Sequence, residues 1–211
     1  IPAGEGGREF NTAQKHNIGW LEKRGMGTGK VIGAETGVGK TAIMIGTHKV
    51  WQADGTLKKN GKNGKTLVVT KKSLKGNVSG ELGNWLKDPK TEAQNIESIS
   101  YQEFMKNPKK WAKYGAIMFD EAHMLKGKTA KVVHAALSFD HPRKVCLTGS
   151  VVQKSPEDLF NMIEISRGKR SSKTELNAKR KRFRQAYCET VGNKVIGLKD
   201  DPKVMDQFFK Y

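Results

Sequence analysis

Two short segments contain residue types that can hold and cleave a nucleotide phosphate. Residues 34–41 read AETGVGKT, and a short apolar stretch precedes them while a helical pattern follows. Glycines let backbone N–H groups turn toward phosphates, and the next helix presents its positive end to the same anion. The lysine neutralises terminal phosphates. The candidate ATP-binding residues of this loop are Thr36, Gly37, Val38, Gly39, Lys40 and Thr41.

The second segment, residues 116–123 (AIMFDEAH), ends an apolar strand with two adjacent carboxylates, about 80 residues after the loop. Thr41 and Asp120 offer the oxygen ligands that Mg²⁺ prefers. Glu121 can orient and deprotonate the water that attacks the terminal phosphate. We therefore expect ATP and Mg²⁺ as cofactors, with Glu121, Lys40 and Asp120 as catalytic residues. A chance glycine-rich turn and a solvated acidic turn are the alternatives, and the spacing disfavours both.

Residues 25–30 (GMGTGK) look superficially similar to the phosphate loop. However, Val31 follows the lysine where a hydroxyl is needed, and Lys30 precedes a strand rather than a helix. We expect no phosphate binding there.

These segments need a scaffold in which strands and helices alternate. Apolar strand candidates occupy residues 31–34, 66–70, 96–101, 116–119 and 144–147, and helical patterns occupy 13–24, 41–51, 81–86 and 102–114. Residues 55–65 are expected to form an exposed connection. This alternation predicts an α/β fold with a mostly parallel sheet flanked by helices, whose ligands lie at the carboxyl ends of the strands.

The net charge of the chain indicates a binding partner. The 211 residues have a formal net charge of +18, which attracts polyanions and makes nucleic acid the leading partner, although lysine-rich surfaces also serve solubility. Residues 167–184 are largely basic. We expect a nucleotide-binding lobe at 1–165, then a basic helical extension and the start of a linker at 166–211.

Cysteine content and hydropathy indicate the compartment. The two cysteines form no CxxC pair, and no apolar run approaches the length of a membrane span. We expect no membrane partner and an intracellular, reducing location, which is bacterial or host cytoplasm or the nucleus.

The order AETGVGKT, FDEAHMLK and LTGSVVQ resembles helicase superfamily two, and most closely its Swi/Snf branch of double-stranded DNA translocases. The resemblance implies a RecA-like P-loop lobe, a double-stranded DNA partner and a second RecA-like lobe, in the same full-length chain or another. The second lobe's arginines are not found here. Because an arginine finger contributes roughly 10³ to 10⁵ in rate, we expect the isolated lobe to hydrolyse ATP poorly.

The resemblance also assigns further residues. Gln14 would recognise adenine, and the residues that couple nucleotide state to DNA would be His123, Thr148, Gly149, Ser150 and Gln153. Val151 and Lys154 replace the family's usual Pro and Asn. The DNA-binding residues would be Lys71, Lys72, Ser73, Ser100, Tyr101, Lys179, Arg180 and Arg182. A surface glutamine, a structural histidine and solvated lysines are the alternatives.

Two other functions stay open at this point. One is an ATP-gated nucleic-acid-binding module without hydrolysis. The other is a P-loop phosphotransferase that acts on a small substrate, although the DEAH sequence and the charge disfavour it.

Overall fold

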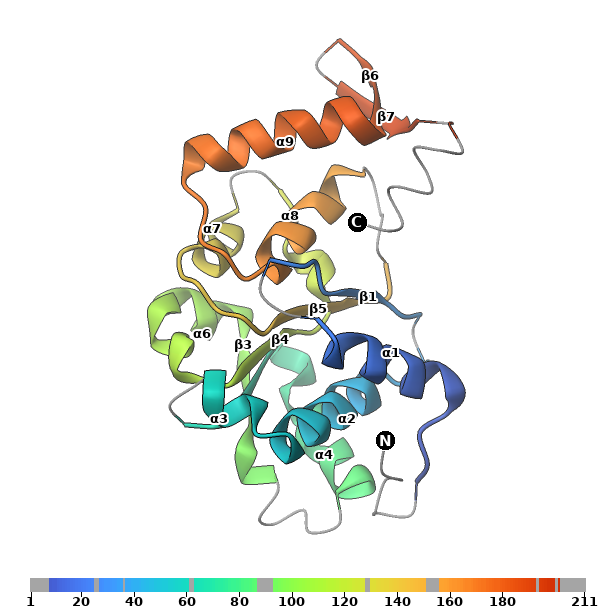
Figure 1. Ribbon diagram of the computed structural model, residues 1–211, viewed down its shortest axis with the longest axis vertical. Coiled ribbons are helices and arrows are strands. Elements are labelled where there is room, and N and C mark those ends of the chain that lie inside the picture. Colours follow the sequence, from blue (N-terminus) through green and yellow to red (C-terminus); the bar gives the residue numbers. More distant parts are fainter. Residues whose placement is uncertain are drawn as a thin grey trace.

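Five short apolar strands form one parallel sheet in the computed structural model (Figure 1). The structure describes residues 8–24, 27–35, 37–60, 63–86, 93–127, 130–150, 156–192, 194–199 and 201. The strands are β1 (Val31–Gly33), β2 (Thr66–Thr70), β3 (Ile96–Ser100), β4 (Ala116–Phe119) and β5 (Lys144–Thr148), in the order β1-β5-β4-β2-β3. All their pairings are parallel. The predicted α/β fold with a parallel sheet is confirmed.

Helices cover both faces of this sheet, which explains why every residue of β2, β4 and β5 is buried. One face carries α1 (Thr12–Glu22), α2 (Lys40–Ala53), α3 (Thr56–Asn60) and α4 (Lys75–Trp85). The other carries α6 (Tyr101–Lys106), α7 (Lys131–Leu137) and α8 (Glu157–Ser166). Successive strand residues alternate between these layers, so Val68 packs against the first group while Leu67 and Val69 pack against the second.

Short 3₁₀ turns complete the lobe: η1 (Lys72–Leu74), η2 (Ala93–Asn95), η3 (Pro108–Lys113) and η4 (Ala122–Met124). The helix predicted over residues 102–114 is split into α6 and η3. Pro108 causes the break, because a proline disfavours helical geometry at the residue before it, and Asn107 has φ −149°. Within the expected connection at 55–65, residues 56–60 form α3.

The C-terminal part is a basic helix followed by a hairpin. Helix α9 (Lys173–Tyr187) begins with a capping box between Ser172 and Glu175 and packs across α8 (Figure 1). Strands β6 (Cys188–Val191) and β7 (Lys194–Leu198) then pair antiparallel. The sequence analysis predicted a basic helical extension and the start of a linker over 166–211, and it did not predict this hairpin. The boundary at residue 165 stays a prediction, and residues 202–211 of the predicted linker lie outside the described residues.

The strand order determines which loops meet. Parallel strands place their carboxyl ends on the same edge, and β1, β5 and β4 are neighbours there. The loop after β1 therefore lies beside the residues that follow β5 and β4. Because β2 borders β4 on its other side, the end of β2 joins the same group.

Candidate functional site

The loop after β1 has the backbone geometry of an anion cradle. Gly37 and Gly39 adopt φ values of +94° and +85°, a region that L side chains rarely occupy. Gly39 is also the N-cap of α2, and no side chain caps that helix end. The free N–H groups of α2 therefore point toward the space that Lys40 and Thr41 line. Thr36 lies outside the described residues.

Lys40 joins this loop to the acidic pair. Its Nζ lies 3.4 Å from the carbonyl oxygen of Ala34, to which it donates, and 3.5 Å from Oε1 of Glu121. The sequence-predicted lysine and glutamate are thus brought together in space.

Asp120 is fixed from two sides. The Thr70 hydroxyl donates to Oδ2 of Asp120 at 2.9 Å, and the Tyr101 hydroxyl donates to the Asp120 carbonyl oxygen at 2.8 Å. Burial raises the pKa of the Asp120 carboxyl above its ordinary value, while the Thr70 hydrogen bond opposes that shift. A nearby cation would favour the charged form of this buried carboxyl, so the environment of Asp120 suits a cation-binding site.

Glu121 has a left-handed backbone, with φ 49° and ψ 47°. Its Oε2 lies 3.0 Å from Nδ1 of His123, and its Oε1 faces Lys40. Burial, and then the positive charge of Lys71, lower the pKa of His123. The imidazole is therefore neutral near pH 7, so its contact with Glu121 is a polar contact and not an ion pair.

A cleft of about 780 Å³ contains these groups. Lys40, Thr41, Asp120 and Glu121 line one end, and residues of α4 line the other, including Trp85, which stacks on Phe10 with ring centroids 4.8 Å apart. Clefts of this size accommodate a nucleotide.

Gln14 lines the same cleft. It is buried, and its Nε2 donates to the carbonyl oxygen of Val38 at 2.9 Å while its Oε1 accepts from the backbone N–H of Asn11. These contacts exclude a surface glutamine and tie α1 to the phosphate loop. Adenine recognition by Gln14 remains a prediction.

The predicted coupling segment follows β5. The Thr148 hydroxyl and the backbone of Ser150 lie 3.1 Å apart, and the N–H of Ala34 donates to the Thr148 carbonyl oxygen at 2.9 Å. Gly149 lies between them, so this segment is in backbone contact with the phosphate loop. Gln153 lies outside the described residues.

The predicted DNA contacts after β2 and β3 have different outcomes. Lys72 and Ser73 are exposed and Lys71 is half-buried at the carboxyl end of β2. Ser100 is mostly buried, and its hydroxyl caps α6. The ring of Tyr101 is buried and its hydroxyl supports Asp120, so a DNA contact by Tyr101 stays a prediction that this burial disfavours.

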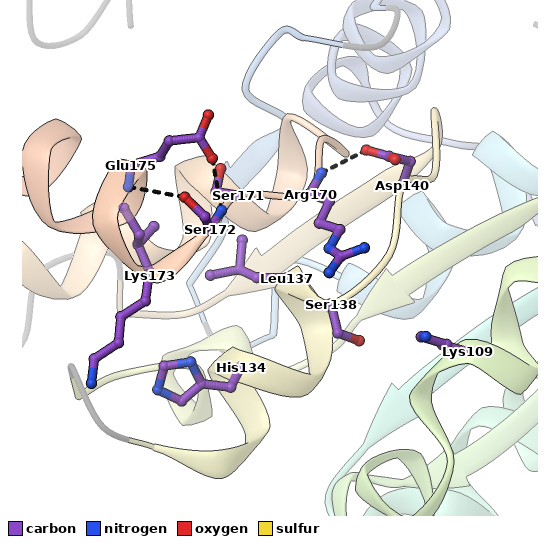
Figure 2. Close-up of a pocket in the computed structure, with 11 residues that line it drawn as sticks. Lys109, His134, Leu137, Ser138, Asp140, Arg170, Ser171, Ser172, Lys173 and Glu175 are labelled. Carbon is purple, nitrogen blue, oxygen red and sulfur yellow. Dashed lines mark hydrogen bonds between the residues drawn. The ribbon is translucent and has the colours of Figure 1, made fainter.

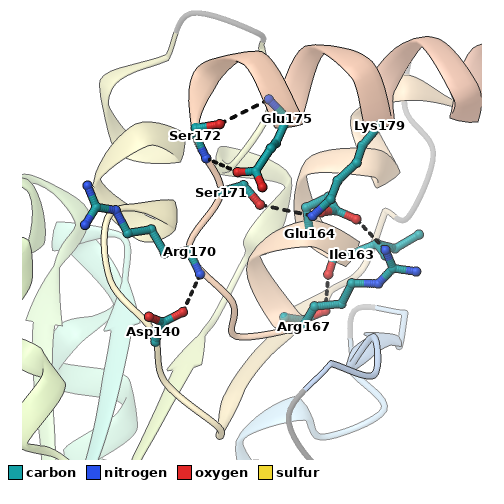
Figure 3. A network of polar contacts seen from close by, with 10 residues as sticks. Asp140, Ile163, Glu164, Arg167, Arg170, Ser171, Ser172, Glu175 and Lys179 are labelled. Carbon is teal, nitrogen blue, oxygen red and sulfur yellow. Dashed lines mark hydrogen bonds and ion pairs between the residues drawn. The ribbon is translucent and has the colours of Figure 1, made fainter.

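The three predicted DNA-binding residues of the basic helix differ in exposure. Arg180 is only 6% exposed, donates to Oδ1 of Asn161 at 2.7 Å and lies over the ring of Phe160, so its DNA contact stays a prediction that this burial disfavours. Lys179 is paired with Glu164 at 2.9 Å (Figure 3). Arg182 is exposed.

Sequence reasoning missed Thr70 and the role of Tyr101 at Asp120. The only available signal was the position of each residue, at or just after the carboxyl end of a strand, where ligand-facing groups collect.

Comparisons with known proteins agree with this geometry. Residues 90–190 match the family model of the SNF2-related domain. The human DNA repair and recombination protein RAD54B is 27% identical over 155 residues, which cover 64% of this chain and 17% of the human protein. The mouse protein is 28% identical, with 64% and 18% covered. The chain thus spans about a sixth of the length of these relatives.

Two solved structures share the fold. The SWI2/SNF2 ATPase core of Sulfolobus solfataricus in complex with dsDNA has a TM-score of 0.64 and 20% identity, covering 81% of this chain and 38% of that one. The UvsW helicase of bacteriophage T4 has a TM-score of 0.53 and 14% identity, covering 77% and 58%. The resemblance to the Swi/Snf branch is confirmed. Among the described residues, no helix has the length and apolar character to cross a bilayer.

Proposed function

We propose that this chain is the ATP-binding first lobe of a DNA-dependent ATPase that translocates on double-stranded DNA, because residues 90–190 match the SNF2-related domain and the fold resembles that of a SWI2/SNF2 ATPase core. The observation that carries the proposal is the meeting of Lys40, Asp120 and Glu121 at one end of a nucleotide-sized cleft. The proposal assigns residues 1–165 to the lobe and residues 166–211 to a basic extension and the start of the linker between lobes.

The phosphate end of the cleft suits a Mg-nucleotide. Gly37 and Gly39 present backbone N–H groups at the N-terminus of α2, and Lys40 adds a positive charge. Mg²⁺ is commonly bound through one or two protein oxygens together with substrate phosphates, and Thr41 and Asp120 offer such oxygens in the same cleft. When bound, the ion neutralises charge on the transferring phosphate.

Glu121 is the proposed general base. It lies beside Lys40, which places the carboxylate close to where a terminal phosphate binds. Nδ1 of His123 lies 3.0 Å from the other carboxylate oxygen. In this arrangement Glu121 accepts the proton of the attacking water. The contact between Ala34 and Thr148 connects the phosphate loop to the segment proposed to relay nucleotide state.

Duplex DNA is the proposed partner. The net charge of +18, with Lys72 and Ser73 exposed beside the nucleotide edge and Arg182 exposed on α9, supplies positive groups for phosphates. RAD54B is named a DNA repair and recombination protein, and the SWI2/SNF2 ATPase core of Sulfolobus solfataricus was solved in complex with dsDNA. A second RecA-like lobe would supply the arginines for efficient turnover. ATP and DNA as ligands place the protein inside the cell.

The test compares ATPase rates with and without double-stranded DNA, for this chain alone and for a longer chain that includes a second lobe. Strong stimulation by DNA in the longer chain, with little turnover by these residues alone, supports the proposal. Robust DNA-independent turnover by this chain alone would indicate a self-contained phosphotransferase. DNA affinity that responds to nucleotide without any turnover in the longer chain would indicate an ATP-gated binding module.

Glu121→Gln in the longer chain tests the base. It should keep ATP binding and abolish hydrolysis, because it preserves shape but removes the proton acceptor. Glu189→Gln, at an exposed position of β6, makes the same chemical change outside the cleft and should leave the rate unchanged. Retained turnover in Glu121→Gln contradicts the assignment.

A further inference from the structure

A second cleft, shown in Figure 2, lies near the amino end of β5, whereas the nucleotide cleft lies at the carboxyl ends of the strands. Its volume is about 650 Å³, and its walls are the end of α7, the loop after α7, the segment between α8 and α9, and the first turn of α9. Residues 138–143 lead into the amino end of β5, whereas the phosphate loop follows the carboxyl end of β1. The two clefts share no lining residue.

Positive side chains surround this second cleft. Lys109, Arg170 and Lys173 line it and are exposed. In the described part of the chain, none of these three forms an ion pair. Figure 2 shows Arg170 and Lys173 on opposite sides of Leu137, which forms an apolar floor between them. The cleft therefore offers cations without an ion-pair partner on both sides of an apolar surface.

Two carboxylates in the wall already hold backbone groups. Asp140 Oδ1 accepts from the N–H of Arg170 at 2.6 Å, and Glu175 Oε2 accepts from the N–H of Ser172 at 2.8 Å (Figure 3). These bonds fix the segment that carries Arg170 and Lys173. Each carboxylate also has oxygen lone pairs left to accept further N–H donors.

The same segment is held by its backbone. Gly168 has φ +78°, and a Cβ at this position would lie 2.0 Å from the carbonyl oxygen of His141. The N–H of His141 donates to the Gly168 carbonyl oxygen at 2.7 Å. Such a preformed wall lowers the entropic cost of binding a ligand.

We infer that this cleft binds an acidic peptide segment of a partner protein. The carboxylates of such a segment pair with Lys109, Arg170 and Lys173, and the planar guanidinium of Arg170 accommodates a carboxylate through two parallel hydrogen bonds. Backbone N–H groups of the segment donate to Asp140 and Glu175. A phosphate backbone has no N–H donors to offer Asp140 and Glu175, whereas a peptide backbone offers one at almost every residue, so the cleft favours a peptide over nucleic acid.

The test measures fluorescence anisotropy of a short fluorescein-labelled peptide of alternating glutamate and alanine, with the whole chain and without nucleotide. The double variant Arg170→Glu and Lys173→Glu should weaken binding by roughly tenfold or more, because like charges then face the peptide. The matched control Lys58→Glu and Lys59→Glu makes the same charge change at exposed positions of α3 and should change affinity by less than about twofold. The same peptide with glutamine in place of glutamate should not bind.

Two results would overturn the inference. Equal weakening in both double variants would mean that the peptide responds only to net charge. Loss of affinity for a short DNA duplex in the Arg170 and Lys173 variant, equal to the loss for the peptide, would assign the cleft to nucleic acid. The neutral pair Arg170→Gln and Lys173→Gln gives a second variant should the charge reversal disturb folding. Because no nucleotide is present, the outcome is independent of the proposed ATPase function.

Discussion

The hydrogen bond from Thr70 to Asp120 predicts a stability change that can be measured directly. Thr70→Val keeps the shape of the side chain and removes the donor that lies 2.9 Å from Asp120 Oδ2. Thr70 is 0% exposed and Asp120 is 8% exposed, so solvent has little access to replace the bond. Hydrogen bonds to charged groups contribute about 1.5 to 3 kcal/mol, and we expect the free energy of unfolding to fall by that amount at pH 7.

Thermal and urea unfolding followed by circular dichroism measure this change. In a chain of this size, 1 kcal/mol corresponds to roughly 2 to 4 °C, so Tm should fall by roughly 3 to 12 °C. Thr66→Val is the matched control on the same strand, because the Thr66 hydroxyl bonds Nδ1 of His48 at 2.8 Å. Burial lowers the pKa of His48 to about 4, so that partner is neutral at pH 7. A neutral hydrogen bond contributes only about 0.5 to 1.5 kcal/mol.

The pH dependence separates the two variants further. Burial already raises the pKa of Asp120, and the Thr70 bond opposes this, so Thr70→Val should raise the pKa of Asp120 again. The variant's folded state then binds a proton over a pH range where the native folded state does not. By linkage, its destabilisation grows as pH rises through that range and shrinks on the acid side. Equal losses for both valine variants, with the same values at pH 5 and pH 7, would refute this reasoning.

Three further predictions follow from individual positions. Gly39→Ala should weaken Mg-ATP binding by roughly 5- to 30-fold in a titration with a fluorescent nucleotide, because a left-handed L residue costs about 1 to 2 kcal/mol. The added Cβ would also lie 2.6 Å from Nε2 of Gln14. Gly37→Ala, whose Cβ would meet nothing within 4 Å, should weaken Mg-ATP binding less. Burial lowers the pKa of Lys144 from 10.5 to about 7. Between these two values the unfolded state binds one more proton than the folded state, so the free energy of unfolding rises with pH there. Lys144→Met should flatten that rise, which urea unfolding at pH 7 and pH 9 measures. Arg180→Met should lower Tm and leave the salt dependence of DNA binding unchanged, because this arginine is buried. Arg182→Ala, at an exposed position, should reduce the slope of log affinity against log salt by about 1 without lowering Tm. The opposite pattern would show that the buried arginine contacts DNA.

The features that the sequence predicted correctly are local in the chain. Gly37 and Gly39 occupy left-handed positions, and β2 is a run of mostly apolar residues, and each feature is visible within a few residues of sequence. The acidic pair after β4 is also visible within a few residues. Such patterns depend on backbone sterics and burial, which neighbouring residues largely determine.

Contacts that depend on strand order could not be predicted this way. Thr70 supports Asp120 only because β2 lies directly beside β4, although 50 residues separate them in the chain. Tyr101 reaches the Asp120 carbonyl oxygen from the residue after β3. No pattern in one sequence orders five parallel strands, and the contacts of both residues with Asp120 were therefore missed.

Two features of the C-terminal part that the sequence analysis did not predict, the burial of Arg180 and the hairpin, had usable signals. Leu176, Arg180 and Phe183 are spaced by four and three residues, which places them on one face of a helix. That face is buried against α8, so helical periodicity, rather than the count of basic residues, decides which cations reach solvent. Similarly, the Gly192-Asn193 dipeptide, with Val191 before it and Lys194 and Val195 after it, is a hairpin signal, and Gly192 adopts φ +57°.

The backbone of Glu121 connects the fold to the proposed chemistry. In the described part of the chain it is the one non-glycine residue with positive φ, which costs about 1 to 2 kcal/mol for an L residue. A glycine there would relax the turn but would carry no carboxylate to place beside Lys40 and His123. The strain therefore accompanies the group that the proposed reaction requires. Glutamine retains both the left-handed backbone and the side-chain length, so Glu121→Gln separates loss of the base from relief of strain, which a glycine variant would combine.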